Sequence, residues 1–173
     1  TAIQVALWGG TYLTLRRWGA LGDQFGNRRV ITVTSMMIAL LPLLWFFGKT
    51  PAWFICTQAF AGFAWSGHSL CATNFIFDAA SPAKRARCFA YFALLNGIAS
   101  CAGTMTGGAL ASVLEGPVRS GALAFIGSEI EAVFLVSFVF RSLSALYIRR
   151  AFREVRAVPH AGTFDLLLRH SFI

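Results

Sequence analysis

Long apolar runs alternate with short polar segments along the chain. Mainly apolar stretches cover residues 30–48, 52–77, 88–113 and 132–148, and residues 1–17 form a shorter one. A helix needs about 20 mainly apolar residues to cross a bilayer. Neither strand alternation nor a short repeat competes with this pattern. The pattern therefore predicts an all-α polytopic transmembrane helical bundle, with one partial span and four complete spans.

The breaks between the runs carry signals that end helices. The segments "GKTP", "DAASP" and the Gly-rich "LEGPVRSGALAFIGSE" combine glycine, proline and small polar residues, which favour turns. Residues 18–29 are predicted to form a loop, and residues 149–173 a tail outside the membrane. The chain opens on Thr1 inside an apolar run, without the preceding basic residues of a secretory signal. We therefore expect a fragment that begins inside a helix.

Composition supports the bilayer as the solvent. The chain is 57% hydrophobic and 13% charged, whereas soluble domains have about half apolar residues and about a quarter charged ones. The net charge of +8 would suit nucleic acid, but the basic residues stand between apolar runs and do not form one patch. We therefore expect the lipid bilayer, and no nucleic acid, as a partner.

No motif indicates an enzyme. The sequence contains no H-E-x-x-H, G-x-S-x-G or Walker loop, so neither a hydrolase nor an ATP-driven pump is expected, and no cofactor. The four cysteines fall inside apolar runs without the spacing of metal ligands. They are interpreted as small apolar residues, and no metal site is predicted.

The basic residues fall on one side of the predicted membrane. If the segment 18–29 is cytoplasmic, then 78–87 and 149–173 are cytoplasmic too. That side holds all but two of the basic residues assigned to a side, Lys49 and Arg119 being the exceptions. Because cytoplasmic loops carry the excess of lysine and arginine, the C-terminus is predicted to be cytoplasmic.

The first polar segment has a recognisable pattern. Gly19-Ala20-Leu21-Gly22-Asp23-Gln24-Phe25-Gly26-Asn27-Arg28-Arg29 resembles the G-x-L-a-D-r-x-G-r-k-x signature of the major facilitator superfamily. That signature lies in the cytoplasmic loop after the second span of each six-helix half. The resemblance implies a latch on the cytoplasmic face, formed by Gly19, Gly22, Asp23, Gly26, Arg28 and Arg29, that holds one conformation and yields during transport.

The chemistry of Asp23 gives the latch a physical basis. Ser81-Pro82 has N-cap and N1 chemistry for the helix that follows. The positive end of that helix would attract the Asp23 carboxylate by about 0.3–2 kcal/mol. The alternative is a solvated turn with a cluster of charges that stops insertion.

The remaining sequence resembles the C-terminal half of the same family. "GFAWSGHSLCATNFIFDAASPAKRARCFAYFALLNGIASCAGTMTGGAL" is similar to the tenth and eleventh spans of bacterial facilitator-type transporters, and "FRSLSALYIRRAFREVR" to the end of the twelfth. No arginine lies between Phe54 and Phe77, where an N-terminal half usually has one. The resemblance implies the end of helix 8 and helices 9 to 12 of a transporter in the bacterial inner membrane, with helices 1–7 as the missing partner.

The resemblance implies secondary active transport of a small solute by alternating access. The resemblance does not identify the substrate or the coupling ion, and it does not distinguish symport, antiport and uniport. The alternative from another class is a non-transporting membrane module, a truncated or split half that binds a partner half. Upstream sequence with six or seven further spans and a second copy of the signature would distinguish the two.

Polar groups at membrane depth are the candidates for lining a solute cavity. Such groups are costly in lipid and usually face protein or water; those on the helices that the resemblance places at the cavity are Gln4, Gln58, His68, Asn74, Asp78 and Asn96. His68 lies near mid-span and has two interpretations, a proton relay or a neutral imidazole hydrogen-bonded to a neighbouring helix. The second is favoured because no acidic residue lies at matching depth.

Three charged residues near the cytoplasmic mouth form a candidate gate. Asp78 precedes the basic loop that contains Arg85 and Arg87, so an ion pair between loops is expected more than a contact with substrate. Arg141 lies eight residues before Arg149, about 12 Å deeper in the membrane. For Arg141, snorkelling to the headgroups is favoured over pairing inside the bundle.

Two further features have structural interpretations. Gly103 and Gly107, extended by Gly108, form a G-x-x-x-G face, which favours close helix packing in lipid. In the tail, Arg149, Arg153 and Arg156 share one helical face that suits anionic headgroups.

Overall fold

The computed structural model describes residues 1–120 and 127–152, and the regular secondary structure in these ranges is entirely helical. The all-α prediction is confirmed for this part of the chain. The helices are α1 (Ala2–Phe25), α2 (Asn27–Phe46), α3 (Pro51–Ala79), α4 (Pro82–Arg119) and α5 (Glu129–Ala151).

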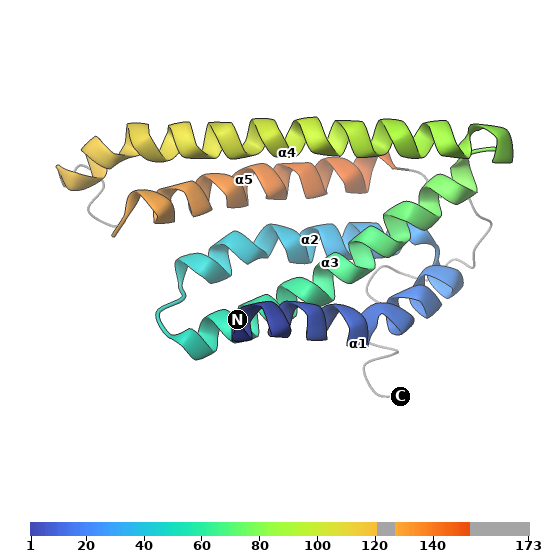
Figure 1. The fold of residues 1–173 in the computed structure, drawn as a ribbon, viewed down its shortest axis with the longest axis horizontal. Coiled ribbons are helices and arrows are strands. Elements are labelled where there is room, and N and C mark those ends of the chain that lie inside the picture. The colour runs from blue at the N-terminus through green and yellow to red at the C-terminus, as the bar shows by residue number, and fades with distance from the viewer. Residues whose placement is uncertain (121–126, 153–173) are drawn as a thin grey trace.

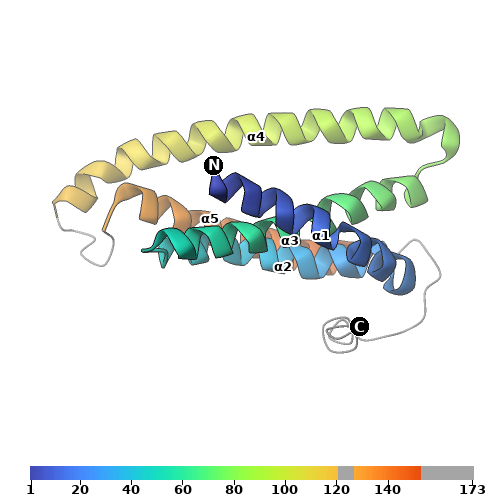
Figure 2. The same cartoon turned by 60° about the horizontal axis from the view of Figure 1, so that its bottom comes forward.

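The helices lie side by side, and the chain reverses direction at each connection (Figure 1). The α1–α2 and α3–α4 connections and the end of α5 lie at one end of the molecule, to the right in Figure 1. The α2–α3 connection and the start of α5 lie at the opposite end, and the turned view of Figure 2 agrees. The described parts of the segments predicted to be cytoplasmic thus lie at one end, which we call the basic end because of residues such as Arg28, Lys84 and Arg149.

Three described helices are long and apolar enough to cross a membrane: α2, α4 and α5. This is compatible with a membrane protein. The predicted span at 52–77 corresponds to α3, which is 29 residues long but has no stretch of comparably high mean hydropathy. The polar side chains of Gln58, Ser66, His68 and Asn74 lower its mean hydropathy. Since α3 packs between α1 and α2, it needs less apolar surface than a helix surrounded by lipid.

Two predicted connections are more helical than expected. Residues 18–29 are not an open loop, because α1 continues to Phe25 and α2 begins at Asn27. The break is Gly26 alone, with φ 90° and ψ 145°, a conformation that only glycine adopts without strain. The connection expected after Val113 begins later, because α4 continues to Arg119. The segment 121–126 lies outside the described residues.

The closest helix crossing in the bundle joins α1 to α3. A Cβ at Gly10 would overlap a backbone carbonyl of α3, and a Cβ at Gly62 would overlap a backbone carbonyl of α1. One turn further along, the hydroxyls of Thr14 and Ser66 form a hydrogen bond of 3.0 Å. Small residues that let backbones approach, together with hydrogen bonds between helices, are what hold helices together in lipid.

The core near the basic end is built around Trp18. This side chain is 4% exposed, and its indole Nε1 donates to the Phe63 carbonyl over 2.8 Å. Gly67 leaves room for the ring, since a Cβ there would lie 2.6 Å from Trp18 Cδ2. Val30 and Ile31 of α2 complete the cluster. Trp18, which directly precedes the signature segment, therefore joins α1, α2 and α3.

The longest helix, α4, is the least covered. It packs mainly along α5 and touches the end of α3, and Figures 1 and 2 show it along one side of the bundle. No residue in the apolar stretch of α4 is buried. Among the described residues, a Cβ at Gly103, Gly107 or Gly108 would meet nothing within 4 Å, so the close packing predicted through these glycines stays a prediction.

Candidate functional site

The signature segment forms a tight helical corner at the basic end. Gly22 is buried in the last turn of α1, where a Cβ would lie 3.0 Å from Asn27 Oδ1 and 3.2 Å from Cys71 Sγ. Gly19 faces Leu70 of α3 at an ordinary van der Waals distance. The glycines of the segment thus let α1 approach both the start of α2 and the middle of α3.

Asn27, the first residue of α2, joins this corner to the end of α3. It is 1% exposed, and its Nδ2 donates to Asp78 Oδ2 over 2.8 Å. Its Oδ1 is buried and has no hydrogen-bond partner among the described residues. The expected contact of Asp78 between connections therefore involves the Asn27 amide. Hydrogen bonds to charged groups contribute about 1.5–3 kcal/mol, with exposed carboxylates such as Asp78 at the lower end.

Arg28 joins the same corner to α5. One of its guanidinium nitrogens donates to the Arg149 carbonyl over 3.0 Å, in the last turn of α5. The carbonyls at a helix C-terminus lack partners within the helix and carry partial negative charge, so a guanidinium there satisfies one and stabilises the helix end. Through Asn27 and Arg28, the start of α2 therefore contacts the ends of both α3 and α5.

The predicted gate residues on α4 have separate roles. Arg85 does not extend toward the signature segment: its Nε donates to the Ala80 carbonyl over 3.2 Å, and its guanidinium lies 5.4 Å from the centre of the Phe77 ring. Arg85 thus stabilises the turn between α3 and α4. Arg87 is exposed one half-turn further on.

Asp23 is exposed in the last turn of α1. Pro82 does occupy the first turn of α4, and Ser81 is its N-cap residue, but the Ser81 side chain makes no capping hydrogen bond. Since the main neighbours of α4 are α5 and α3, the docking of Asp23 on α4 stays a prediction.

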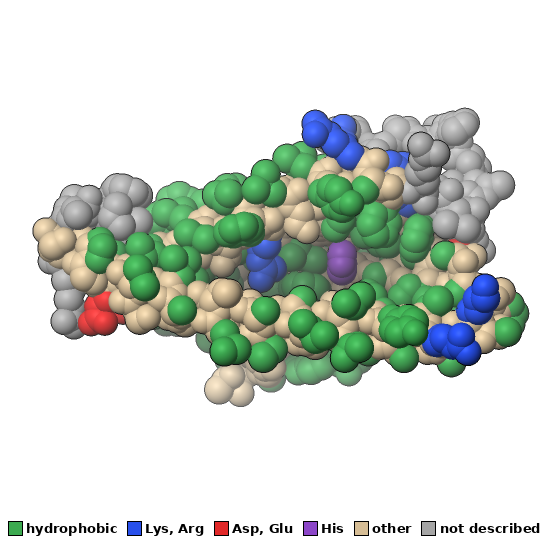
Figure 3. Space-filling view, turned by 90° about the horizontal axis from the view of Figure 1, so that it is seen from above, with side chains coloured by type: hydrophobic (Ala, Val, Ile, Leu, Met, Phe, Trp, Pro, Cys, Tyr) green, Lys and Arg blue, Asp and Glu red, His purple; other side chains and the backbone are tan. Residues whose placement is uncertain are grey.

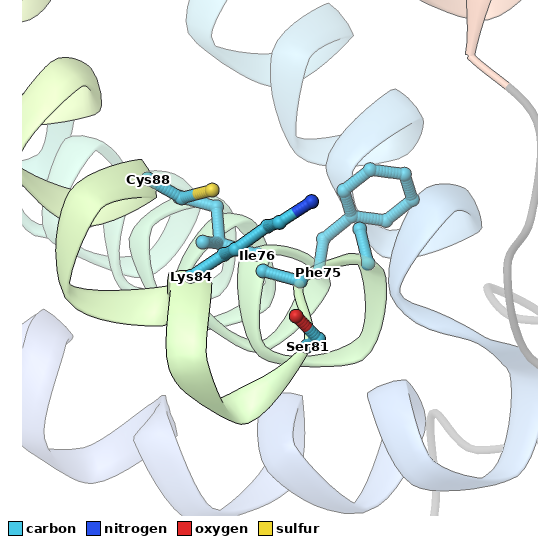
Figure 4. Close-up of a pocket in the computed structure, with 7 residues that line it drawn as sticks. Phe75, Ile76, Ser81, Lys84 and Cys88 are labelled. Carbon is cyan, nitrogen blue, oxygen red and sulfur yellow. The ribbon is translucent and has the colours of Figure 1, made fainter.

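A shallow pocket lies where α3 turns into α4. Figure 4 shows Lys84 and Cys88 reaching from the first turns of α4 across Phe75 and Ile76 of α3, with Ser81 at the turn. The volume is about 460 Å³. Its lining is mainly apolar apart from Ser81 and the Lys84 side chain, and the pocket lies at the basic end of the molecule.

A larger cleft, which we call the α3–α5 cleft, lies deeper in the bundle. It has a volume of about 490 Å³ and is lined from α1, α2, α3 and α5. Among its lining residues are Trp45, Gln58, Trp65, Ser137 and Arg141. Gln58, which was predicted to line a solute cavity, is one of the residues that line this cleft. Arg141, which was expected to snorkel to the headgroups, is exposed and is one of the residues that line this cleft.

A second cleft, the α4–α5 cleft, shares part of the same wall. Its volume is about 430 Å³, and it is lined by Gly103 and Gly107 of α4 and by Ser137 and Arg141 of α5. The glycines predicted to pack helices therefore leave space beside α5. Figure 3 shows a hollow along this face of the molecule, with basic and histidine side chains inside it.

The other predicted cavity residues are dispersed. His68 Nδ1 lies 3.3 Å from Ser35 Oγ of α2, which agrees with the favoured interpretation of a hydrogen bond to a neighbouring helix. Asn74 is half-buried. Asn96 is exposed on α4 and donates to the Phe92 carbonyl of its own helix, so it lines neither cleft. Gln4 is exposed near the start of α1.

Three residues of the site were missed or misjudged from the sequence. Asn27 belongs to the quoted signature, but its own side chain was not considered as a partner for Asp78. Ser35 gave no signal, because a serine inside an apolar helix is common. Arg141 did give one, because a basic residue in the middle of an apolar run is rare. No family model, curated protein or solved structure matches the chain.

Proposed function

We propose that the chain belongs to a secondary active transporter of the major-facilitator type and moves a small solute by alternating access. The observation that carries the proposal is the corner around Gly26. There the signature segment contacts the end of α3 through Asn27 and the end of α5 through Arg28. A segment that contacts several helix ends at one face is suited to holding that face in one conformation.

Two further observations support the proposal. The clefts on either side of α5 place polar side chains inside an otherwise apolar bundle, as a solute path in a membrane requires. The apolar face of α4 is uncovered among the described residues, which leaves room for lipid or for the N-terminal helices 1–7 that the proposal includes. Under this proposal the protein lies in the inner membrane with its basic end in the cytoplasm.

Alternating access needs a balance between two conformations that a few interactions can shift. Loss of about 1–2 kcal/mol from one of them changes their ratio by roughly 5- to 30-fold. Asp23 is the test position, since its side chain is exposed and interactions of exposed charges typically contribute about 1 kcal/mol or less to stability.

The experiment compares Asp23→Asn with wild type in the protein expressed from its complete gene. Expression and membrane insertion should stay unchanged, whereas Ala83→Cys should react faster from the cytoplasmic side and solute flux should fall. Asp23→Glu keeps the charge and should be intermediate. If Asp23→Asn leaves both the reactivity of Ala83→Cys and the flux unchanged, the segment is a charged turn and not a latch.

A further inference from the structure

Arg141 occupies an unusual position for a basic residue. It lies 12 residues after the start of α5 at Glu129 and 10 residues before its end at Ala151. At 1.5 Å per residue it is about 18 Å from one end of the helix and about 15 Å from the other. α5 is one of the helices apolar enough to cross a membrane, so the guanidinium lies near the middle of the span.

A charge at this depth needs compensation. Charged side chains at the bilayer centre are costly, and they usually pair with an opposite charge or face a polar cavity. The described acidic residues all lie toward helix ends: Asp23, Asp78, Glu115, Glu129 and Glu131. No hydrogen bond or ion pair joins Arg141 to another residue within ranges 1–120 and 127–152. The residues that the structure describes therefore do not supply the counter-charge.

The surroundings of Arg141 resemble a binding site more than a packing contact. Arg141 and Ser137 line both the α3–α5 cleft and the α4–α5 cleft. The volumes of about 490 and 430 Å³ fall within the usual range of about 300–1,000 Å³ for small-molecule sites. Trp45 and Trp65 add aromatic surface, and Gln58 adds an amide that donates and accepts hydrogen bonds.

We infer that the α3–α5 cleft binds a small organic carboxylate, whose charged group pairs with Arg141 and whose apolar part lies against Trp45 and Trp65. A guanidinium donates two parallel hydrogen bonds to a carboxylate, and the aromatic rings suit an apolar or aromatic body. The anion supplies the counter-charge that the helices lack. This inference rests on the proposed function, because it names the class of solute that the transporter moves.

The same chemistry is offered by an anionic lipid headgroup. The depth of Arg141 favours the free solute, because a headgroup lies at the membrane surface and Arg141 lies about 15 Å or more along the helix from either end. Two membrane compositions distinguish these sources. Binding of a soluble carboxylate in zwitterionic nanodiscs supports the inference. If adding anionic phosphatidylglycerol to the nanodiscs abolishes binding of the soluble carboxylate, the lipid headgroup occupies the cleft, and the inference is contradicted.

The binding experiment uses benzoate as the probe and benzamide as its neutral counterpart. The protein expressed from its complete gene is placed in phosphatidylcholine nanodiscs, and tryptophan fluorescence is followed, since Trp45 and Trp65 line the cleft. Benzoate should give a saturable change that benzamide does not give. Replacing both tryptophans by phenylalanine should remove the change in fluorescence, and calorimetry should still detect the binding.

Substitutions of Arg141 test the role of the charge. Arg141→Gln should weaken benzoate binding by about tenfold or more, because charge-assisted hydrogen bonds are among the strongest. Arg141→Lys keeps the charge without the paired donors and should be intermediate. Arg150→Gln removes a basic residue from the end of the same helix and serves as the matched control, with binding unchanged. Removing a charge at this depth of an apolar helix should not impair insertion, which a size-exclusion profile checks for each variant.

The inference and the proposed function fail in different ways. Equal affinity of wild type and Arg141→Gln, or equal binding of benzoate and benzamide, overturns the inference even if the protein transports another solute. Saturable benzoate binding that depends on Arg141 supports it even if proteoliposomes show no flux, and in that case the proposed transport is contradicted instead.

Discussion

Gly67→Ala should destabilise the bundle at the point where the signature segment enters it. The added Cβ would lie 2.6 Å from Trp18 Cδ2 and 2.9 Å from Thr34 Cγ2. Carbon atoms prefer separations of about 3.5–4.0 Å, so the indole has to retreat by roughly 1 Å. Trp18 cannot retreat freely, because it is 4% exposed and its Nε1 is bonded to the Phe63 carbonyl over 2.8 Å.

The expected cost has two parts. Overpacking a filled core costs about 1–3 kcal/mol, and weakening the indole hydrogen bond adds about 0.5–1.5 kcal/mol. We therefore expect Gly67→Ala to lower the free energy of unfolding by about 2–4 kcal/mol. Denaturant titration in detergent micelles, followed by circular dichroism, measures this difference.

Gly103→Ala is the matched control. A Cβ there meets nothing within 4 Å, so the substitution should be neutral or should stabilise the helix by up to about 1 kcal/mol. Trp18→Phe supplies a second check, because the smaller ring relieves the overlap. The double variant Trp18→Phe/Gly67→Ala should be less destabilised than the sum of the single variants. If Gly67→Ala and Gly103→Ala are equally stable, the packing of Trp18 against α3 is not as described.

The remaining predictions concern the two ends of the molecule. With the native cysteines replaced by alanine, Ser120→Cys should react with an impermeant thiol reagent in intact cells and Ala83→Cys should not; the opposite result reverses the orientation. Asn27→Ala should lower stability by about 1–2 kcal/mol, Asp78→Ala should cost a similar amount, and thermal unfolding of the double variant should show little further loss. Fully additive losses would mean that the two side chains act independently. Arg28→Gln should speed amide hydrogen exchange in the last turn of α5, and unchanged exchange there would remove the assigned role of this guanidinium.

The sequence predicts the helical elements well because their signals are local. Apolar length marks α2 and α5, and proline at the first turn marks the starts of α3 and α4. The lengths of the connections between helices depend less on the local sequence. Gly26 alone turns the chain between α1 and α2, because α3 packs against both helices and favours helical structure up to the turn. The polar, glycine-rich sequence of residues 18–29 does not by itself indicate this packing against α3.

The partners within the site depend on tertiary contacts. Helical periodicity places Gly67 and Asp78 on one face of α3, but it does not identify their neighbours Trp18 and Asn27. The glycines of α4 show the opposite error. Gly103 and Gly107 match a packing motif, yet no described residue lies within 4 Å of a Cβ at either, because a motif does not specify whether a partner helix is present. Arg141 was visible as an anomaly, and the structure adds the two clefts that it lines.

The most direct test of alternating access uses Ser137→Cys, a near-isosteric change at a half-buried position that lines both clefts. The variant, in a background with the native cysteines replaced by alanine, is exposed to an impermeant thiol reagent in intact cells and, separately, in inverted membrane vesicles. The account predicts reaction from both sides, with Asp23→Asn shifting reactivity toward the cytoplasmic side. Reaction from one side only, unchanged by Asp23→Asn, or no reaction from either side would contradict it.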